Sequence, residues 1–253
     1  MQFDAIVLAG GESSSALKEM SPYKNEALII IGQYPMIHYV SQALINSANI
    51  RNIVISGPVE ALRNLLDKNE RLHFVESGGD AVKSFYNGLE RLRQIGATEK
   101  VLIASTDIPL ITTEAIDDFI IRSKSYEADF YYPLARREET EKKFPGVQRT
   151  YVKLKEGTFT GGNLFILKHQ AVGSVLNKAR EIYARRKSSL ALVHLFGLPV
   201  LVRYIFNMLT LEYAEKVFYN VLGLKGKAII SPFTELSIDV DKPSDLELVQ
   251  QYL

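Results

Sequence analysis

An aspartate at the end of an apolar run is the residue of this sequence with the clearest chemical potential. Asp107 follows Lys100–Ser105 (KVLIAS), which has the composition of a buried strand. A carboxylate at the exposed end of such a strand is costly to enclose without a partner, so we expect it to face a cleft. Pro109 ends the strand and Thr112 can cap the next helix, which holds the aspartate from both sides. The alternative is a turn aspartate that bonds to its own backbone.

Two glycine pairs are also placed where they can bind a ligand. Gly10 and Gly11 end the apolar run Phe3–Ala9 (FDAIVLA), and Gly78 and Gly79 precede a predicted helix. Glycine lets the backbone approach a ligand closely, and the amide groups freed in such turns suit phosphate oxygens. The amino terminus of a helix adds a positive dipole end to the second pair. Each pair taken alone is also compatible with a structural turn or a helix cap.

Alternating strands and helices position these residues in the first half of the sequence. The predicted strands are Phe3–Ala9, Ile50–Ser56, Leu72–Glu76 and Lys100–Ser105, and the predicted helices are Met36–Ala48, Val59–Asp67 and Ala81–Ile95. This spacing predicts parallel strands joined by right-handed crossovers. Open α/β sheets bind ligands beyond the carboxyl ends of their strands, where the first glycine pair is expected.

The second half has a less regular pattern. Its predicted elements are a helix at Thr112–Ser123, strands at Ala128–Ala135, Thr150–Leu154, Phe159–Leu167, Lys227–Ser231 and Leu236–Val240, and a helix at Ser244–Tyr252. Alternation from Leu236 onward places Asp239 and Asp241 on one polar face. The segment Arg136–Lys143 (RREETEKK) is predicted to be a solvated loop. A mobile loop that closes over a phosphorylated acceptor is the alternative.

Composition narrows the class of protein. The chain has 253 residues, 47% of them hydrophobic, which is enough for one large α/β domain or one domain with an inserted lobe. A net charge of +1 without a basic stripe argues against nucleic acid as a partner. The absence of cysteine excludes disulfides, thiolate zinc sites and a cysteine nucleophile. The amino terminus lacks the features of a signal peptide, so we expect a cytoplasmic protein.

One segment raises the question of a membrane. Leu190–Leu211 is strongly apolar, but Arg203 and other polar residues interrupt it. A charged residue near the centre of a spanning helix costs about 2.5–3.5 kcal/mol, so two short helices broken at Gly197-Leu198-Pro199 fit better. The sequence therefore predicts no integral membrane segment. Buried or partner-facing helices are favoured, with a homodimer through the apolar helices 188–222 as one possibility.

The opening of the sequence resembles that of a known superfamily. VLAGG, a polar loop that carries a lysine, and ALIIIGQYPMIHYV resemble the nucleotidyltransferases with a glycosyltransferase-A-like fold, which include molybdenum cofactor guanylyltransferases, cytidylyltransferases and sugar-phosphate nucleotidyltransferases. The resemblance implies a single α/β domain with three layers, α/β/α, around a mostly parallel mixed sheet. It also implies a nucleotide-binding half at 1–110, an acceptor and metal half at 111–168 and 226–253, and a helical insertion at 169–225.

In this superfamily the glycine loop embraces the nucleotide phosphates, and an arginine and a lysine neutralise them. The residues that the resemblance assigns to the phosphates are Leu8, Ala9, Gly10, Gly11, Lys18 and Lys24. Two positions depart from the pattern. Ser15 stands where the arginine is usual, and Glu26 directly precedes the apolar strand, where the lysine is usual, while Lys24 lies two residues earlier. Lys18 and Lys24 are also compatible with plain surface charge.

Further motifs resemble the nucleoside and metal sites of the superfamily. SGGDAVKSFYNGLERL is similar to a cytidylyltransferase segment that faces base and ribose, which implies that role for Gly78, Gly79 and Ser84. Asp107 falls on the metal-binding D-x-P signature, and DVDKPSDL resembles the closing motif that supplies the second metal ligand. That ligand would be Asp241, with Asp239 as second choice. Paired carboxylates of this kind hold magnesium together with substrate phosphates.

The acceptor residues are implied by a third motif. The strand with TGGNLF resembles the superfamily strand that lines the acceptor or sugar pocket, which implicates Thr160, Gly162 and Asn163. Arg149 and Lys153 could meet an anionic acceptor. A β-bulge or hairpin is the alternative for the glycines.

The resemblance implies a magnesium-dependent nucleotidyltransferase. An oxygen of a small-molecule acceptor, on a phosphate or another group, would attack the α-phosphorus of a nucleoside triphosphate (NTP), and pyrophosphate would leave. Lys24, Asp107 and Asp241 would carry the catalysis. Two alternatives stay open. Ser15 in place of arginine suggests a nucleotide-binding protein with impaired catalysis. A sugar-nucleotide glycosyltransferase is disfavoured because the D-x-D sequence, Asp239-Val240-Asp241, lies near the end of the chain instead of in its middle.

Overall fold

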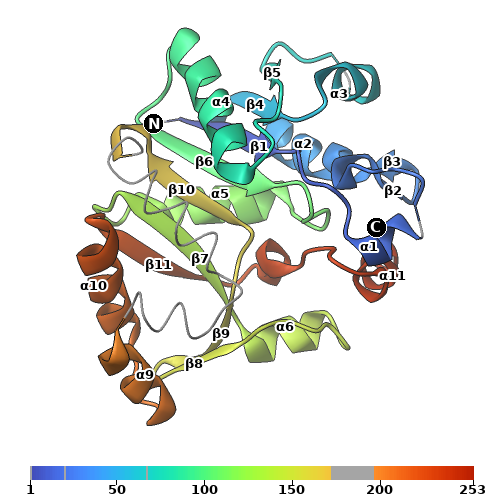
Figure 1. The fold of residues 1–253 in the computed structure, drawn as a ribbon. Helices are drawn as coiled ribbons and strands as arrows, with labels where there is room; N and C mark the ends of the chain where they lie inside the picture. The colour runs from blue at the N-terminus through green and yellow to red at the C-terminus, as the bar shows by residue number, and fades with distance from the viewer. Residues whose placement is uncertain (1, 20, 67, 172–196) are drawn as a thin grey trace.

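A computed structural model describes residues 2–19, 21–66, 68–171 and 197–253 of the chain. Within these residues a nine-stranded sheet has the order β5-β4-β1-β6-β10-β7-β9-β8, and β11 also pairs with β7 (Figure 1). Its strands are β1 Phe3–Leu8, β4 Ile50–Ser56, β5 Leu72–Val75, β6 Lys100–Ser105, β7 Phe130–Arg136, β8 Val152–Leu154, β9 Gly157–Gly161, β10 Leu164–Lys168 and β11 Gly226–Ser231. A small antiparallel pair, β2 Ile30–Ile31 and β3 Tyr34–Pro35, stands apart.

The first half of the sheet is parallel, as the sequence predicts. β5, β4, β1 and β6 pair in parallel. Helices α2 (Met36–Asn46), α3 (Val59–Leu65) and α4 (Ala81–Gln94) lie between them in the chain. Because the strands run in one direction, the segments after β1, β5 and β6 all leave the same edge of the sheet.

The second half mixes strand directions. β10 runs antiparallel to both β6 and β7, and β9 is antiparallel to β7 and β8, whereas β11 is parallel to β7. β9 and β10 are interrupted at Gly162 and Asn163, where the chain passes from the end of β7 to the middle of the sheet. The polar residues around this interruption lie at the same edge as the segment after β6, because Ser105 N–H donates to Asn163 O at 3.2 Å.

Helices cover both faces of the sheet, which confirms the predicted three-layer α/β fold with a mixed sheet (Figure 1). Alternation along β1 divides its side chains between the two layers. Ala5 and Val7 join the core cluster formed with α2 and α5 (Thr113–Ser123), and Ile6 joins the cluster formed with α4. A Cβ added to Gly88 of α4 would lie 2.8 Å from Ile6, so glycine allows this close packing.

Two local predictions are wrong. The segment predicted as a solvated loop forms helix α6 (Arg137–Lys143) with Thr140 buried. Its acidic residues fill the first turn and its lysines the last, which matches the helix dipole. The predicted strand Leu236–Val240 is instead a 3₁₀ turn, Thr234–Ser237, followed by irregular chain. Ile238 and Val240 are nevertheless buried, so the expected alternation persists.

The helical block is described only in part. The predicted insertion 169–225 includes residues 172–196, which lie outside the described residues. The remaining part contains α9 (Leu198–Ile205) and α10 (Leu211–Leu222), and α10 lies along β11 (Figure 1). α9 begins directly after Gly197, which has φ of 89°, and a proline stands in its first turn. The helix predicted before Gly197 lies outside the described residues, so the predicted break between two helices stays a prediction. Among the described helices, none has the length and hydropathy needed to cross a membrane.

The remaining elements are short. They are α1 (Ser15–Lys18), α11 (Pro243–Gln250), and 3₁₀ turns at Glu26–Leu28 and His169–Ala171. In α11, Asp245 accepts hydrogen bonds from the backbone N–H groups of Asp241 and Lys242, each at 3.1 Å. This cap holds Asp241 in place at the end of the irregular segment.

Candidate functional site

The two glycine loops lie against each other at the carboxyl edge of the parallel strands. A Cβ added to Gly10 would lie 2.5 Å from the Cβ of Ser77, so the first loop touches the second and tolerates no side chain there. Gly78 N–H donates to the buried Ser84 Oγ at 3.0 Å, which ties the second loop to α4. The structure thus brings together the residues that the sequence assigned to phosphates and to the nucleoside.

A backbone hydrogen bond joins the segment of Asp107 to the segment of Asp241 and brings the two residues together. Val240 N–H donates to the carbonyl oxygen of Asp107 at 2.8 Å. Ser14 Oγ in turn donates to the carbonyl oxygen of Asp241 at 2.9 Å, which attaches the first loop to the same segment. Residues more than a hundred positions apart are therefore held by main-chain contacts, as their predicted shared cleft requires.

Asp107, Asp239 and Asp241, here called the acid triad, bring one carboxylate oxygen each to within 4.8 Å of one another. The amide of Asn163 bridges two of them, with its Nδ2 donating to Asp239 Oδ2 at 2.7 Å and to Asp107 Oδ1 at 3.5 Å. Ser105 Oγ also donates to Asp107 Oδ1. Asp241 is exposed. Neutral donors thus hold Asp107, and Asp239 also meets the guanidinium of Arg149.

Burial makes two acids of this site, Asp107 and Glu26, reluctant to ionise. It raises the pKa of Asp107, and the nearby charge of Asp241 adds to the rise, while the hydrogen bond from Ser105 lowers it. Burial also raises the pKa of Glu26 to about 7, and Asp107 and Asp241 contribute further. Several carboxylates gathered in one place therefore need a compensating cation.

The residues of the triad fit a hard divalent cation. They offer only carboxylate oxygens, the donors that Mg²⁺ and Mn²⁺ prefer, although Asp239 Oδ1 already meets the guanidinium of Arg149. The triad would hold the cation, which would supply positive charge beside a negatively charged ligand.

A cavity of about 370 Å³ opens beside the triad. Its lining residues are Tyr132, Gln148, Arg149, Thr150, Thr160, Gly161, Asn163, Asp239, Asp241, Lys242 and Asp245. The pocket contains two cations, three aspartates and several hydroxyl and amide groups, so it suits a polar ligand and would take negative charge at Arg149 and Lys242 once the aspartates are compensated. Burial raises the pKa of Tyr132, which keeps its hydroxyl protonated as a donor.

The five residues assigned to the acceptor from the sequence lie in different environments. Arg149, Thr160 and Asn163 line the cavity. Gly162 is buried behind it, where an added Cβ would lie 2.8 Å from Pro133. Lys153 is exposed on β8 and is not among the lining residues. Sequence reasoning missed Tyr132 and Lys242, although the position of Lys242 directly after Asp241 was a usable signal.

The phosphate-binding loop is less basic than the superfamily pattern implies. Lys24 is exposed, and Lys18 forms an ion pair with Glu12 at 3.0 Å. Glu26 lies directly over the loop, because a Cβ added to Gly11 would fall 2.1 Å from its Oε1. The carboxylate of Glu26 thus lies where the resemblance places the nucleotide phosphates. The sequence contained this signal, since Glu26 stands where the superfamily has lysine.

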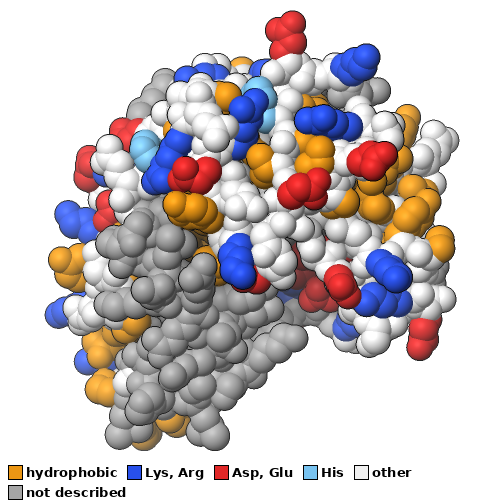
Figure 2. Space-filling view, turned by 45° about the horizontal axis from the view of Figure 1, so that its top comes forward, with side chains coloured by type: hydrophobic (Ala, Val, Ile, Leu, Met, Phe, Trp, Pro, Cys, Tyr) orange, Lys and Arg blue, Asp and Glu red, His pale blue; other side chains and the backbone are white. Residues whose placement is uncertain are grey.

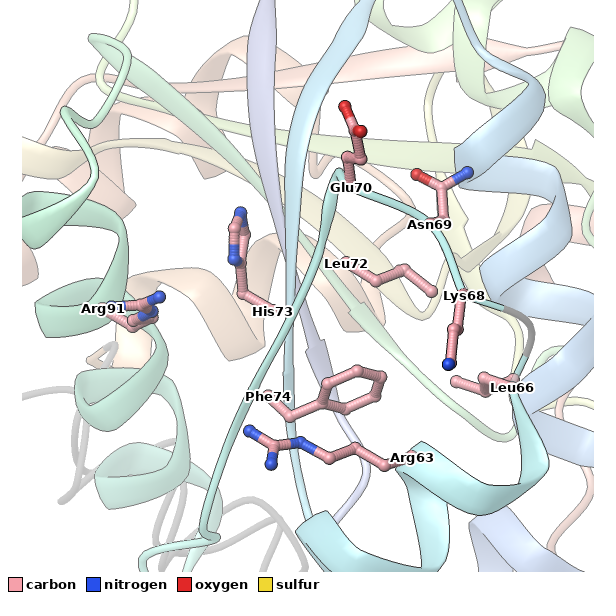
Figure 3. A pocket seen from close by; sticks show the side chains of 9 residues that line it. All are labelled: Arg63, Leu66, Lys68, Asn69, Glu70, Leu72, His73, Phe74 and Arg91. Carbon is pink, nitrogen blue, oxygen red and sulfur yellow. The ribbon is translucent and has the colours of Figure 1, made fainter.

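A larger hollow, of about 870 Å³, lies elsewhere, along the edge strand β5 (Figure 3). Arg63 reaches over the ring of Phe74, and Arg91 faces His73 from α4. None of the acid triad lines it, so its size does not make it the chemical site.

On the face shown in Figure 2, acidic and basic side chains are interspersed over the described surface. That face shows no basic stripe of the kind that binds nucleic acid.

Comparisons with known proteins agree with this geometry. Residues 5–205 match the family described as the MobA-like NTP transferase domain. A hypothetical transferase from Thermus thermophilus has 33% sequence identity and a TM-score of 0.85, with 97% of this chain and 100% of that chain covered. No curated protein sequence matches.

Two solved structures with lower identity share the fold. The 4-diphosphocytidyl-2C-methyl-D-erythritol synthase of Anaerococcus prevotii has a TM-score of 0.62 at 11% identity, over 99% of this chain and 98% of that one. A CMP:2-keto-3-deoxy-manno-octonic acid synthetase in complex with CTP has a TM-score of 0.60 at 12% identity, over 100% and 98%. The chain therefore belongs to the MobA-like NTP transferase domain family, a family of nucleotidyltransferases.

Proposed function

We propose that this protein transfers a nucleoside monophosphate from an NTP to an oxygen of an anionic small-molecule acceptor, with release of pyrophosphate and in dependence on Mg²⁺. The observation that carries the proposal is the acid triad, which is attached to the first glycine loop by the hydrogen bond from Ser14 to Asp241 and contributes Asp239 and Asp241 to the wall of a polar cavity. A donor and an acceptor can therefore meet over the same carboxylates.

The two glycine loops form the nucleotide side of the site. The backbone at Gly10 and Gly11 would approach the triphosphate, with the exposed Lys24 as its cation. Gly78, Gly79 and Ser84 would contact the nucleoside. Gly79 has φ of 80° and open space around its Cα, so its backbone is accessible to a ligand.

The cavity beside the triad is the acceptor side. Thr160 and Asn163 would position the attacking oxygen, and Lys242 would meet negative charge on the acceptor. A bound divalent cation would supply charge compensation at the transferred phosphoryl group. Little covalent chemistry is required of the side chains, because orientation and charge compensation carry most of the rate in phosphoryl transfer.

Pyrophosphate release tests the proposal. Each of the four NTPs is offered with Mg²⁺ and a panel of sugar phosphates, polyol phosphates and phosphate-free alcohols, after a thermal-shift screen has identified the NTP that binds. Asp107→Asn should reduce metal-dependent pyrophosphate release by about a hundredfold or more, since it removes a carboxylate from the triad. Asp118→Asn is a matched control, because Asp118 pairs with Arg122 on the surface of α5. Full activity of Asp107→Asn would remove the assignment.

Impaired catalysis is a second candidate function. It is favoured by Glu26, whose carboxylate lies over Gly11, and by Ser15 in the place of the arginine. A protein of this kind would bind an NTP, as the thermal shift reports, and release no pyrophosphate with any acceptor. Restoration of turnover by Glu26→Lys would identify Glu26 as the cause.

A further inference from the structure

Arg149 contacts the acid triad through a buried ion pair. Its guanidinium meets Asp239 Oδ1, and the two side chains are only 14% and 13% exposed. Arg149 Nε is buried without a hydrogen bond. A buried pair that leaves a polar atom unsatisfied keeps part of its desolvation cost.

The three carboxylates of the triad differ in their hydrogen-bond and ion-pair partners. Asp239 meets Asn163 on one oxygen and Arg149 on the other. Ser105 and Asn163 both donate to the same oxygen of Asp107, and no side chain in the described ranges donates to the carboxylate of Asp241. Arg149 contacts only Asp239 directly, while Asp241 and Asp107 also lie near enough for their charges to act on its guanidinium. Asp107 and Asp241 are therefore the carboxylates more open to a cation.

We propose that Arg149 is a built-in counter-cation that competes with a divalent metal ion for Asp239. The guanidinium and the metal ion repel each other at contact distance from one carboxylate oxygen, so binding of one weakens binding of the other. In the metal-free protein Arg149 holds Asp239. Once a divalent cation has taken that oxygen, the guanidinium is released.

The release has a direction. Arg149 lines the acceptor cavity together with Tyr132 and Thr160, so a guanidinium displaced from Asp239 stays on the wall of that cavity. An anionic group of the acceptor can then replace Asp239 as its partner, and the planar fork of arginine suits a carboxylate or phosphate. The metal ion therefore prepares the cavity for an anionic acceptor. This consequence rests on the proposed function, whereas the competition itself does not.

Binding of Mn²⁺ to the full chain without nucleotide tests the competition directly. Electron paramagnetic resonance of free Mn²⁺ gives the affinity of wild type, Arg149→Gln, Arg149→Lys and Lys155→Gln. Arg149→Gln should bind Mn²⁺ about tenfold or more tightly than wild type, because one repelling charge is gone from the site. Arg149→Lys should fall between the two. Lys155→Gln changes the net charge equally at an exposed turn and should stay within about twofold of wild type.

Thermal stability gives a second readout that does not need turnover. In EDTA, Arg149→Gln should melt at a lower temperature than wild type, because the triad has lost its counter-cation. Saturating Mg²⁺ should raise its melting temperature by more than it raises that of wild type. Far-UV circular dichroism verifies that the variant is folded before either measurement.

The outcomes separate this inference from the proposed function. Unchanged or weaker Mn²⁺ binding in Arg149→Gln, with wild-type binding that is lost in Asp107→Asn, would overturn the competition and leave the metal site standing. Absence of Mn²⁺ binding in both wild type and Arg149→Gln would overturn both. Binding that appears only in Arg149→Gln would support the competition in its strongest form.

Discussion

Two aspartate sites at opposite edges of the same strands are built in opposite ways. Asp4, near the amino end of β1, is fully buried and is surrounded by donors from its own chain. Arg51 donates to it through two nitrogens at 3.1 and 3.0 Å, and Thr98 N–H donates at 2.6 Å. Asp107, beyond the carboxyl end of β6, has instead two other aspartates as neighbours.

The difference separates a carboxylate that serves the fold from carboxylates that await a ligand. A buried charge with a full set of partners stabilises the native state, or at least costs it little, and its removal leaves the partners unsatisfied. Clustered carboxylates with few donors destabilise the native state until a cation arrives. The parallel half of the sheet thus has a structural edge and a functional edge.

The largest expected effect is the difference in folding stability between a variant of Asp4 and a variant of Asp107. Asp4→Asn should lower the free energy of unfolding by about 2–3 kcal/mol, because Arg51 loses its buried partner. Asp107→Asn should leave the free energy of unfolding unchanged or raise it, since burial opposes the charge of Asp107. Urea unfolding in EDTA, followed by circular dichroism, measures both. Equal destabilisation by the two variants would mean that the triad is structural and would end the comparison.

Glu26 allows a finer test through pH. Its pKa is raised from 4.5 to about 7 in the folded protein. Between these two pH values Glu26 is therefore protonated in the folded protein and ionised in the unfolded chain. Glu26 therefore lowers the stability of wild type as the pH rises from about 4.5 to about 7, and the loss persists above pH 7. Glu26→Gln should match wild type near pH 4.5 and exceed it by about 2–3 kcal/mol at pH 8 in EDTA.

The control for this prediction is Glu247→Gln, which removes an exposed carboxylate from α11. It should follow the pH profile of wild type. A Glu26→Gln profile parallel to that of wild type across the whole range would show that Glu26 is not held by the acids of the functional edge.

The smallest expected effect concerns the exposed cations of the glycine loop. Lys24→Ala should raise the KM for the NTP about threefold to tenfold with little change in kcat, because an exposed lysine contributes binding that is equal in ground and transition states. Lys18→Ala should change KM less, since Lys18 is already paired with Glu12. A loss of kcat in Lys24→Ala would move Lys24 from phosphate binding to catalysis.

Much of the fold was predictable because its signals are local. The strands β4 and β6 have the predicted bounds, since their branched apolar residues end sharply at glycine or at a polar turn. The α/β class and the family resemblance are confirmed. Helix α6 was missed because its seven residues carry no apolar periodicity. Its capping charges and the Lys143–Glu235 ion pair at 2.6 Å stabilise it instead.

The candidate site was predictable in its acids and less so in its cations. Asp107 belongs to the D-x-P signature and Asp241 to the closing motif, and the structure brings these two acids together. The partnership of Arg149 with Asp239 depends on a loop between α6 and β8, which no local pattern specifies. Individual roles of these residues, the division into halves at 1–110 and beyond, the homodimer and the cytoplasmic location stay predictions.

The hydrogen bond from Val240 to Asp107 has a consequence for the order in which the protein becomes competent. All nine strands of the described sheet are complete by Ser231, whereas two acids of the triad come later in the chain. The segment after Ser231 also completes the cores, since Leu236, Ile238, Val240, Leu246 and Val249 are buried in them. The cation site therefore forms together with the last of the hydrophobic packing. A chain truncated after Ser231 would keep Asp107 but would lack the other two acids of the triad and this packing.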